Sequence, residues 1–105
     1  MAYNGWTNYE TWLVNLWMGA GQGSREFFRG QAREIYDSTD LGPHRGALAR
    51  LRFAGWLKEH YDENIPEMPG VYNDLLGVAL GAVNWIQIAR HYIDAVREEV
   101  ADANA

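Results

Sequence analysis

Apolar residues recur at three- and four-residue spacings along most of the chain, as they do on one face of an α-helix. This spacing predicts helices at about residues 8–18, 25–36, 44–61, 71–80 and 85–102. No stretch alternates between apolar and polar residues at every second position, so no strand is expected. The pattern therefore predicts an all-α fold, a single-domain bundle of about five helices over residues 1–105, with residues 103–105 as a loose tail.

The start of the first helix is marked by Thr7 and Glu10, which have the spacing of a capping box. Five large apolar residues share one face of this helix and are expected to point inward: Tyr9, Trp12, Leu13, Leu16 and Trp17. Of these, Trp12, Leu13 and Leu16 are the predicted core residues. The glycines of residues 19–23 end the helix.

The second and third helices differ in how many sides are apolar. Ser24 is expected to cap the second helix, with Phe28, Ala32 and Ile35 facing inward. The third helix is apolar on two sides, which predicts a central position with neighbours on both. One side comprises Ala47, Leu48, Leu51 and Ala54, and the other Phe53, Trp56 and Leu57.

The last helix has the clearest pattern. Asn84 and Gln87 are placed to open it. Its predicted inward stripe is Trp85, Ile88, Ala89, Tyr92, Ile93, Val96 and Val100, and its polar residues lie on the other side. The short apolar helix before it is expected to end near Gly81.

Composition limits the classes of protein. The chain has 105 residues, 48% of them hydrophobic, and no Cys, so disulfides and thiolate metal sites are excluded. No run approaches the roughly 20 apolar residues of a membrane span, and residues 1–5 do not resemble a secretory signal. We therefore expect a cytoplasmic protein with no membrane contact. The net charge of −5 argues against binding to nucleic acid through bulk charge alone.

No motif supports an enzyme. His44, His60 and His91 lack the spacing of metal ligands, and neither Ser24 nor Ser38 lies in a nucleophile motif. The glycines of residues 19–23 lack the lysine of a phosphate-binding loop. The acidic segment at residues 62–67 is typical of a solvated loop. We expect no catalytic residues, cofactor or metal.

Arginine accounts for eight of the nine basic residues, as the printed sequence shows. Arg25, Arg29 and Arg33 fall at i, i+4 and i+8, in one stripe beside the apolar face of the second helix. Three more arginines lie at the start of the third helix: Arg45, Arg50 and Arg52. This surface is suited to phosphates or an acidic protein; the alternative is local pairing with Glu26, Glu34 and Glu59.

Aromatic residues gather near the N-terminus. Tyr3, Trp6 and Trp17 are not easily placed on one buried stripe, and exposed aromatics are favoured anchors for partners. Core packing is the alternative for these three residues. Residues 76–93 can also be fitted to a helix-turn-helix, but the would-be recognition helix is apolar and has few bases, which disfavours DNA binding.

Two segments resemble a family of small proteins found in bacteriophages and other mobile elements. The N-terminal block GWTNYETWLV, residues 5–14, is similar to their opening pattern W-x-N-Y-x-T-W-x-V. The C-terminal block VNWIQIARHY, residues 83–92, is similar to a second pattern, V-x-W-x-x-I-A-x-H. The resemblance carries no assigned reaction.

The resemblance implies a context for the function. Small acidic proteins of mobile elements often bind a host machine and block it, as anti-CRISPR and anti-restriction inhibitors do. The leading hypothesis is a non-enzymatic inhibitor that binds a host protein or complex through the arginines and exposed aromatics. The alternatives are a nucleic-acid-binding accessory protein and a homo-oligomeric structural protein of the phage.

Overall fold

The computed structural model describes residues 3–40 and 42–103 and confirms an all-α fold of five helices. The helices are α1 (Tyr9–Met18), α2 (Gln22–Asp37), α3 (Arg45–Glu63), α4 (Gly70–Gly81) and α5 (Trp85–Ala103). Ala103, predicted in a loose tail, ends α5 instead, while residues 104–105 lie outside the described residues. Within the described ranges, no helix is long and apolar enough to span a membrane.

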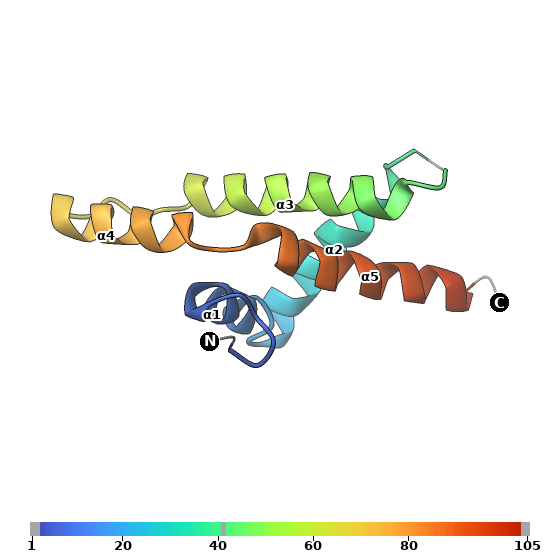
Figure 1. The fold of residues 1–105 in the computed structure, drawn as a ribbon, viewed down its shortest axis with the longest axis horizontal. Helices are drawn as coiled ribbons and strands as arrows, with labels where there is room; N and C mark the ends of the chain where they lie inside the picture. Colours follow the sequence, from blue (N-terminus) through green and yellow to red (C-terminus); the bar gives the residue numbers. More distant parts are fainter. Residues whose placement is uncertain (1–2, 41, 104–105) are drawn as a thin grey trace.

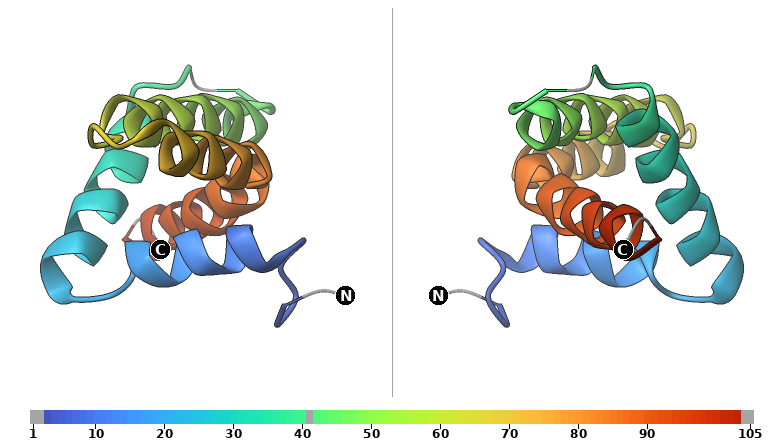
Figure 2. Two further views of the ribbon diagram at one scale, coloured as in Figure 1. Left: turned by 90° about the vertical axis from the view of Figure 1, so that its left-hand side faces the viewer. Right: turned by 90° about the vertical axis from the view of Figure 1, so that its right-hand side faces the viewer.

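The core lies where α3 and α5 pack side by side and α2 crosses them (Figure 1). Phe53 and Leu57 of α3 are fully buried against Ile88 and Ile93 of α5. Phe28, Ala32 and Tyr36 of α2 close the core from the side. α1 lies at the N-terminal end of α2, and Figure 2 shows it below α5, on the side of α5 away from α3. The predicted inward stripe of α5 is confirmed, with Trp85 and Val100 half-buried at its ends.

α4 extends away from this core. It forms one end of a molecule that measures 51 × 29 × 27 Å (Figure 1). None of its twelve residues is buried. The helix is nevertheless strongly apolar, with Asp74 as its only charged residue. α4 is thus held by its chain connections and by a few partly buried contacts.

The inward face predicted for α1 is wrong. Thr11 and Met18 are fully buried and Val14 packs on the core, so the helix is turned almost half a revolution from the prediction. Leu16 is 48% exposed and Trp17 is 67% exposed. The reason is that Thr11, although polar, has its hydroxyl satisfied by hydrogen bonds and can therefore be buried.

One of the two apolar sides predicted for α3 is also wrong. Leu48 and Leu51 are exposed, Leu51 to 60%. Ala54, expected beside them, is buried, as is Ala49. α2 and α5 cover the side that carries Phe53 and Leu57, and α4 lies beyond the end of α3, so among the described residues no helix covers Leu48 and Leu51.

Two of the predicted helix starts are shifted. The N-cap of α1 is Asn8, not Thr7, because the Asn8 side chain accepts the hydrogen bond of the Thr11 N–H. α2 begins at Gln22, ahead of Ser24, whose hydroxyl instead donates to the carbonyl of Met18. The predicted opening of α5 is confirmed, since the N–H of Gln87 donates to Asn84 Oδ1.

Candidate binding surfaces

The N-terminal and C-terminal blocks meet in space. The Oε1 atom of Gln87 accepts hydrogen bonds from the backbone N–H of Thr7 at 2.9 Å and from its hydroxyl at 2.8 Å. Gln87 Nε2 donates to the carbonyl of Gly5, and Asn84 Nδ2 donates to Thr7 Oγ1. One glutamine therefore fixes the segment before α1 against the first turn of α5.

A second set of hydrogen bonds joins the same blocks nearer the core. Thr11 Oγ1 donates to Asn8 Oδ1 at 2.6 Å and accepts from the backbone N–H of Asn84 at 2.8 Å. Asn8 Nδ2 donates to the carbonyl of Ala82. The polar residues of the two blocks thus cap both helices and hold them together, which is a structural role.

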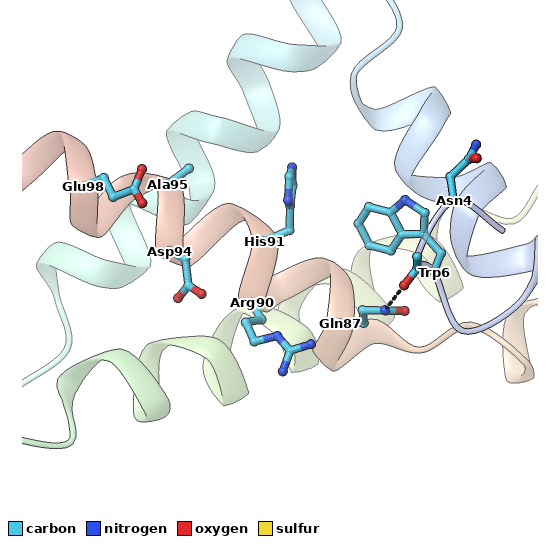
Figure 3. A pocket seen from close by; sticks show the side chains of 9 residues that line it. Asn4, Trp6, Gln87, Arg90, His91, Asp94, Ala95 and Glu98 are labelled. Atoms are coloured by element: carbon cyan, nitrogen blue, oxygen red, sulfur yellow. Dashed lines mark hydrogen bonds between the residues drawn. The ribbon is translucent and has the colours of Figure 1, made fainter. Parts of the chain in front are cut away.

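A shallow groove lies beside this joint. Trp6 forms one wall, with its ring edge-to-face against His91 at 5.6 Å between centroids (Figure 3). The groove has a volume of about 630 Å³ and continues along α5 past Arg90, Asp94 and Glu98. Its walls carry both signs of charge, and Asp94 is already paired with Arg50. The groove shows no single chemical preference.

The arginines of α2 do not form the free stripe that the spacing predicted. Arg29 pairs with Glu99 of α5, and Arg33 binds Asp37 through its Nε at 3.0 Å. Arg25 is exposed and lines a pocket described below. Ion pairing is therefore extensive, but with partners other than the glutamates that were considered, Glu26, Glu34 and Glu59.

The arginines of α3 are occupied as well. Arg45 donates to the carbonyl of Tyr36 and covers the ring of that residue at 4.0 Å. Arg50 binds Asp94 at 2.6 Å. Arg52 donates to Thr39 Oγ1 and to the carbonyl of Ile35. These side chains tie α3 to α5, to the last turn of α2 and to Thr39 after it, which leaves little of their charge for a partner.

The aromatic candidates divide into two kinds. Trp6 is half-buried and packs on the core, and Tyr3 is exposed with its ring edge-to-face on Tyr9. Trp17 is exposed over two-thirds of its surface. Tyr9, Leu16 and Trp17 are exposed and, together with the half-buried Leu13, form an apolar surface called here the α1 outer face.

The sequence reading missed a second uncovered surface. Val71, Leu75 and Val78 of α4, called here the α4 seam, are each exposed over more than 60% of their surface. Their spacing of four and then three residues is that of a helix–helix seam. That spacing, in a helix with a single charge, is the signal in the sequence that could have identified it.

A small pocket lies where α1, α2 and α5 meet. It has a volume of about 300 Å³ and is lined by Asn15, Gly19, Arg25, Arg29, His91, Tyr92 and Ala95. We call it the Asn15 pocket. Burial raises the pKa of Tyr92, while the positive charges of Arg29 and Arg25 act in the opposite direction. Both guanidinium groups therefore lie close enough to influence the phenol.

The side chains considered for catalysis make structural contacts. His60 stacks on Trp56 with centroids 4.9 Å apart, and Ser38 donates to the carbonyl of Ile35. Among the residues that the structure describes, no three His, Asp or Glu side chains gather as metal ligands would. In the described residues, the features suited to binding are the α1 outer face, the α4 seam, the groove beside Trp6 and the Asn15 pocket.

Comparison with known families gives one result. The chain belongs to a family of unknown function, DUF7249, whose model matches residues 1–103. The match includes both blocks and every described helix. A search of curated proteins and a search of solved structures each found no match.

Proposed function

We propose that this protein is a non-enzymatic binding protein that attaches to a protein of its host cell and blocks it, as an inhibitor of a defence system of the anti-CRISPR or anti-restriction type does. The observation that carries the binding role is the α1 outer face. The resemblance of the two blocks to proteins of mobile elements supports a host target. Arg25, Arg29 and the other arginines have a smaller part in this proposal than the sequence suggested.

The α1 outer face is costly to leave in water. Leu16 and Trp17 lie on the side of α1 that points away from the core, the exposed Tyr9 extends the same surface, and the half-buried Leu13 lies at its margin. The helix carries one charged residue, Glu10, so the face is apolar with a thin polar margin. Large aromatic residues at the centre of an apolar patch are the usual energetic anchors of protein interfaces. An apolar surface on a protein partner fits this face best.

The alternative of a nucleic-acid-binding protein has less support. Five of the six candidate arginines are bound to carboxylates, carbonyls or hydroxyls of the same chain. The net charge is −5. Binding to nucleic acid depends on unpaired positive charge that faces the phosphates. The paired arginines and the negative net charge therefore disfavour the nucleic-acid-binding alternative.

Self-association is the second candidate, and the α4 seam favours it. Two copies of α4 can pair with their seams together, since one Asp74 per helix adds little repulsion. The three apolar side chains of the α4 seam in each copy make a small interface, so we expect association only at high concentration. Light scattering over a concentration series measures it, and Val78→Glu should keep the protein monomeric.

The proposed host-binding role is tested by affinity purification from the native host, followed by reconstitution with the purified candidate. The double variant Leu16→Glu/Trp17→Glu should lose the partner, because charge on the α1 outer face blocks an apolar contact. Leu51→Glu, on the uncovered side of α3, is the matched control and should retain it.

Reconstitution decides whether binding inhibits. The purified host complex should lose activity in proportion to added wild-type protein, and the α1 variant should leave it active. The proposal fails if the α1 variant captures and inhibits the same complex as the wild type, or if the captured complex stays fully active.

A further inference from the structure

The α1 outer face and the α4 seam match each other in spacing. The α1 outer face presents Tyr9, Leu13 and Leu16 in one row, at spacings of four and three residues. The α4 seam has the same two spacings along its own helix. Apolar residues at these spacings are what one helix presents to another when their side chains interlock. Each of the two surfaces is therefore suited to receive a helix.

The two helices also match in charge and in length. Glu10 is the single charged residue of α1, and Asp74 is the single charged residue of α4. The helices have ten and twelve residues. A short apolar helix with little charge complements either surface best, because a charged partner helix would lose water without gaining an opposite charge. This chain supplies such a helix for each of its two surfaces.

The two surfaces do not cover each other within one molecule. α4 forms one end of the molecule, and α1 lies at the N-terminal end of α2 (Figures 1 and 2). Leu16 and Leu75 are both exposed. Because α4 extends away from the core, its seam is placed to contact another molecule.

From this match we infer that the α4 seam of one molecule packs on the α1 outer face of a second copy, and that a two-fold axis repeats the contact. Each copy then gives its α4 to the other and receives one in return, as a symmetric dimer requires. Pairing of α4 with α4 would leave both α1 outer faces in water, whereas the reciprocal arrangement covers all four surfaces. The helices run antiparallel, which brings opposite ends of their dipoles together and places Leu16 beside Val71 of the second copy.

The contact has to be made twice because each helix is short. The ten residues of α1 span about 15 Å, with a width of about 10 Å. A single α1–α4 contact is therefore well below the total of about 1,200 Å² at which stable interfaces begin. The two-fold axis doubles the buried area and brings it closer to that range. We expect a weak dimer in equilibrium with the monomer.

Dimer formation hides the surface that we propose for host binding. The α1 outer face cannot hold α4 of a second copy and a host protein at the same time. The monomer is then the form that binds the host protein, and the dimer is an inactive store. This consequence rests on the proposed function, whereas the dimer itself does not.

Sedimentation velocity of the purified protein over a concentration series tests the pairing without any host component. Leu16→Glu alone and Val71→Lys alone should each raise the dissociation constant of the dimer about tenfold or more, because a charge then enters both apolar contacts. The double variant Leu16→Glu/Val71→Lys should return to within about threefold of the wild type, because the two opposite charges face each other.

A second double variant is the matched control. Leu16→Glu/Leu51→Lys has the same net charge, but its lysine lies on the uncovered side of α3. It should associate as weakly as Leu16→Glu. All three positions are exposed, so the substitutions leave the core intact, and circular dichroism checks the helix content of each variant.

The inference is overturned if Leu16→Glu associates as strongly as the wild type, which is the result expected when α4 pairs with α4. It is also overturned if both double variants recover equally, or if the wild type is monomeric at every concentration. Host capture is measured separately with Val71→Lys, which keeps the α1 outer face and should still bind the host protein. A failed capture beside a confirmed dimer contradicts the proposed function and leaves the pairing standing.

Discussion

The side-chain oxygen of Gln87 accepts two hydrogen bonds from Thr7, a residue 80 positions earlier in the chain. The Nε2 atom of the same glutamine donates to the carbonyl of Gly5, so both the oxygen and the nitrogen of its side-chain amide hold the segment before α1. The polar residues of the two blocks thus join α1 to α5. The presence of both blocks in a sequence therefore indicates this fold and is not by itself evidence of a function.

Replacing Gln87 with Leu should lower the free energy of unfolding by about 1–3 kcal/mol, because three hydrogen bonds are lost at a partly exposed site. Urea denaturation measures the change. Gln22→Leu is the control, since Gln22 bonds only to Glu26 on the surface, and it should change stability by less than about 0.5 kcal/mol. Equal effects of the two substitutions would show that the joint contributes nothing.

The orientation of α1 is tested by two neighbouring residues. Met18→Ala should lower the free energy of unfolding by about 2–5 kcal/mol, because Met18 is fully buried in the core. Trp17→Ala should change it by less than about 1 kcal/mol, because most of the ring is exposed. Thermal or urea unfolding of both variants gives the comparison. The reverse order would support the face predicted from the sequence.

Stability should fall at high pH because of Tyr61. Burial, with a smaller effect of Tyr92, raises the pKa of Tyr61 from 10.0 to about 12. Between these values the unfolded chain loses the phenolic proton and the folded protein keeps it. The stabilisation is therefore fully present below pH 10 and is lost as the pH rises to about 12.

Urea denaturation at a series of pH values up to 12 measures this loss. Tyr61→Phe has no phenol at this position and should show a weaker decline over the same range. Tyr92, whose pKa is also raised, accounts for part of what remains. A variant that declines as steeply as the wild type would rule out Tyr61 as the source.

Backbone amides of α4 should exchange with solvent faster than those of α5 in dilute protein. No residue of α4 is buried, whereas five residues of α5 are, and protection follows local burial. Hydrogen exchange followed by mass spectrometry measures both helices in one experiment. Protection of α4 that grows with protein concentration would indicate pairing of the α4 seam. Slow exchange of α4 at all concentrations would contradict the view that this helix is weakly held.

The parts of the fold that the sequence predicts are those with a clear contrast between faces. On α5, Ile88, Tyr92 and Val96 form an apolar stripe, and the opposite side of the helix is charged. The helix can therefore pack on the core in only one orientation. α1 has no such contrast, because it is apolar around most of its circumference. Its orientation depends on Thr11, whose hydroxyl is satisfied by a backbone N–H 73 residues away. That contact cannot be inferred from local spacing.

For the binding surfaces too, the sequence predicts contacts within one helix but not contacts between helices. Arg33 and Asp37 pair at four residues' distance, which the sequence can show. Arg29 pairs with Glu99, and Arg50 pairs with Asp94, each on a different helix. Pairs between helices cannot be predicted from local spacing in the sequence. The Asn15 pocket draws on three helices, so local spacing cannot show that Arg25 and Arg29 lie beside Asn15, His91 and Tyr92.

The joint between the two blocks also sets an order for folding. Gly5, Asn8 and Thr11 each have a hydrogen-bond partner in residues 82–87, so these contacts of α1 and the segment before it cannot form until α5 has been translated. Contacts this distant in sequence slow folding and leave apolar segments open to chaperones meanwhile. A ribosome-bound chain that lacks α5 should therefore still expose Trp6, and release of α5 should bury Trp6 in one late step.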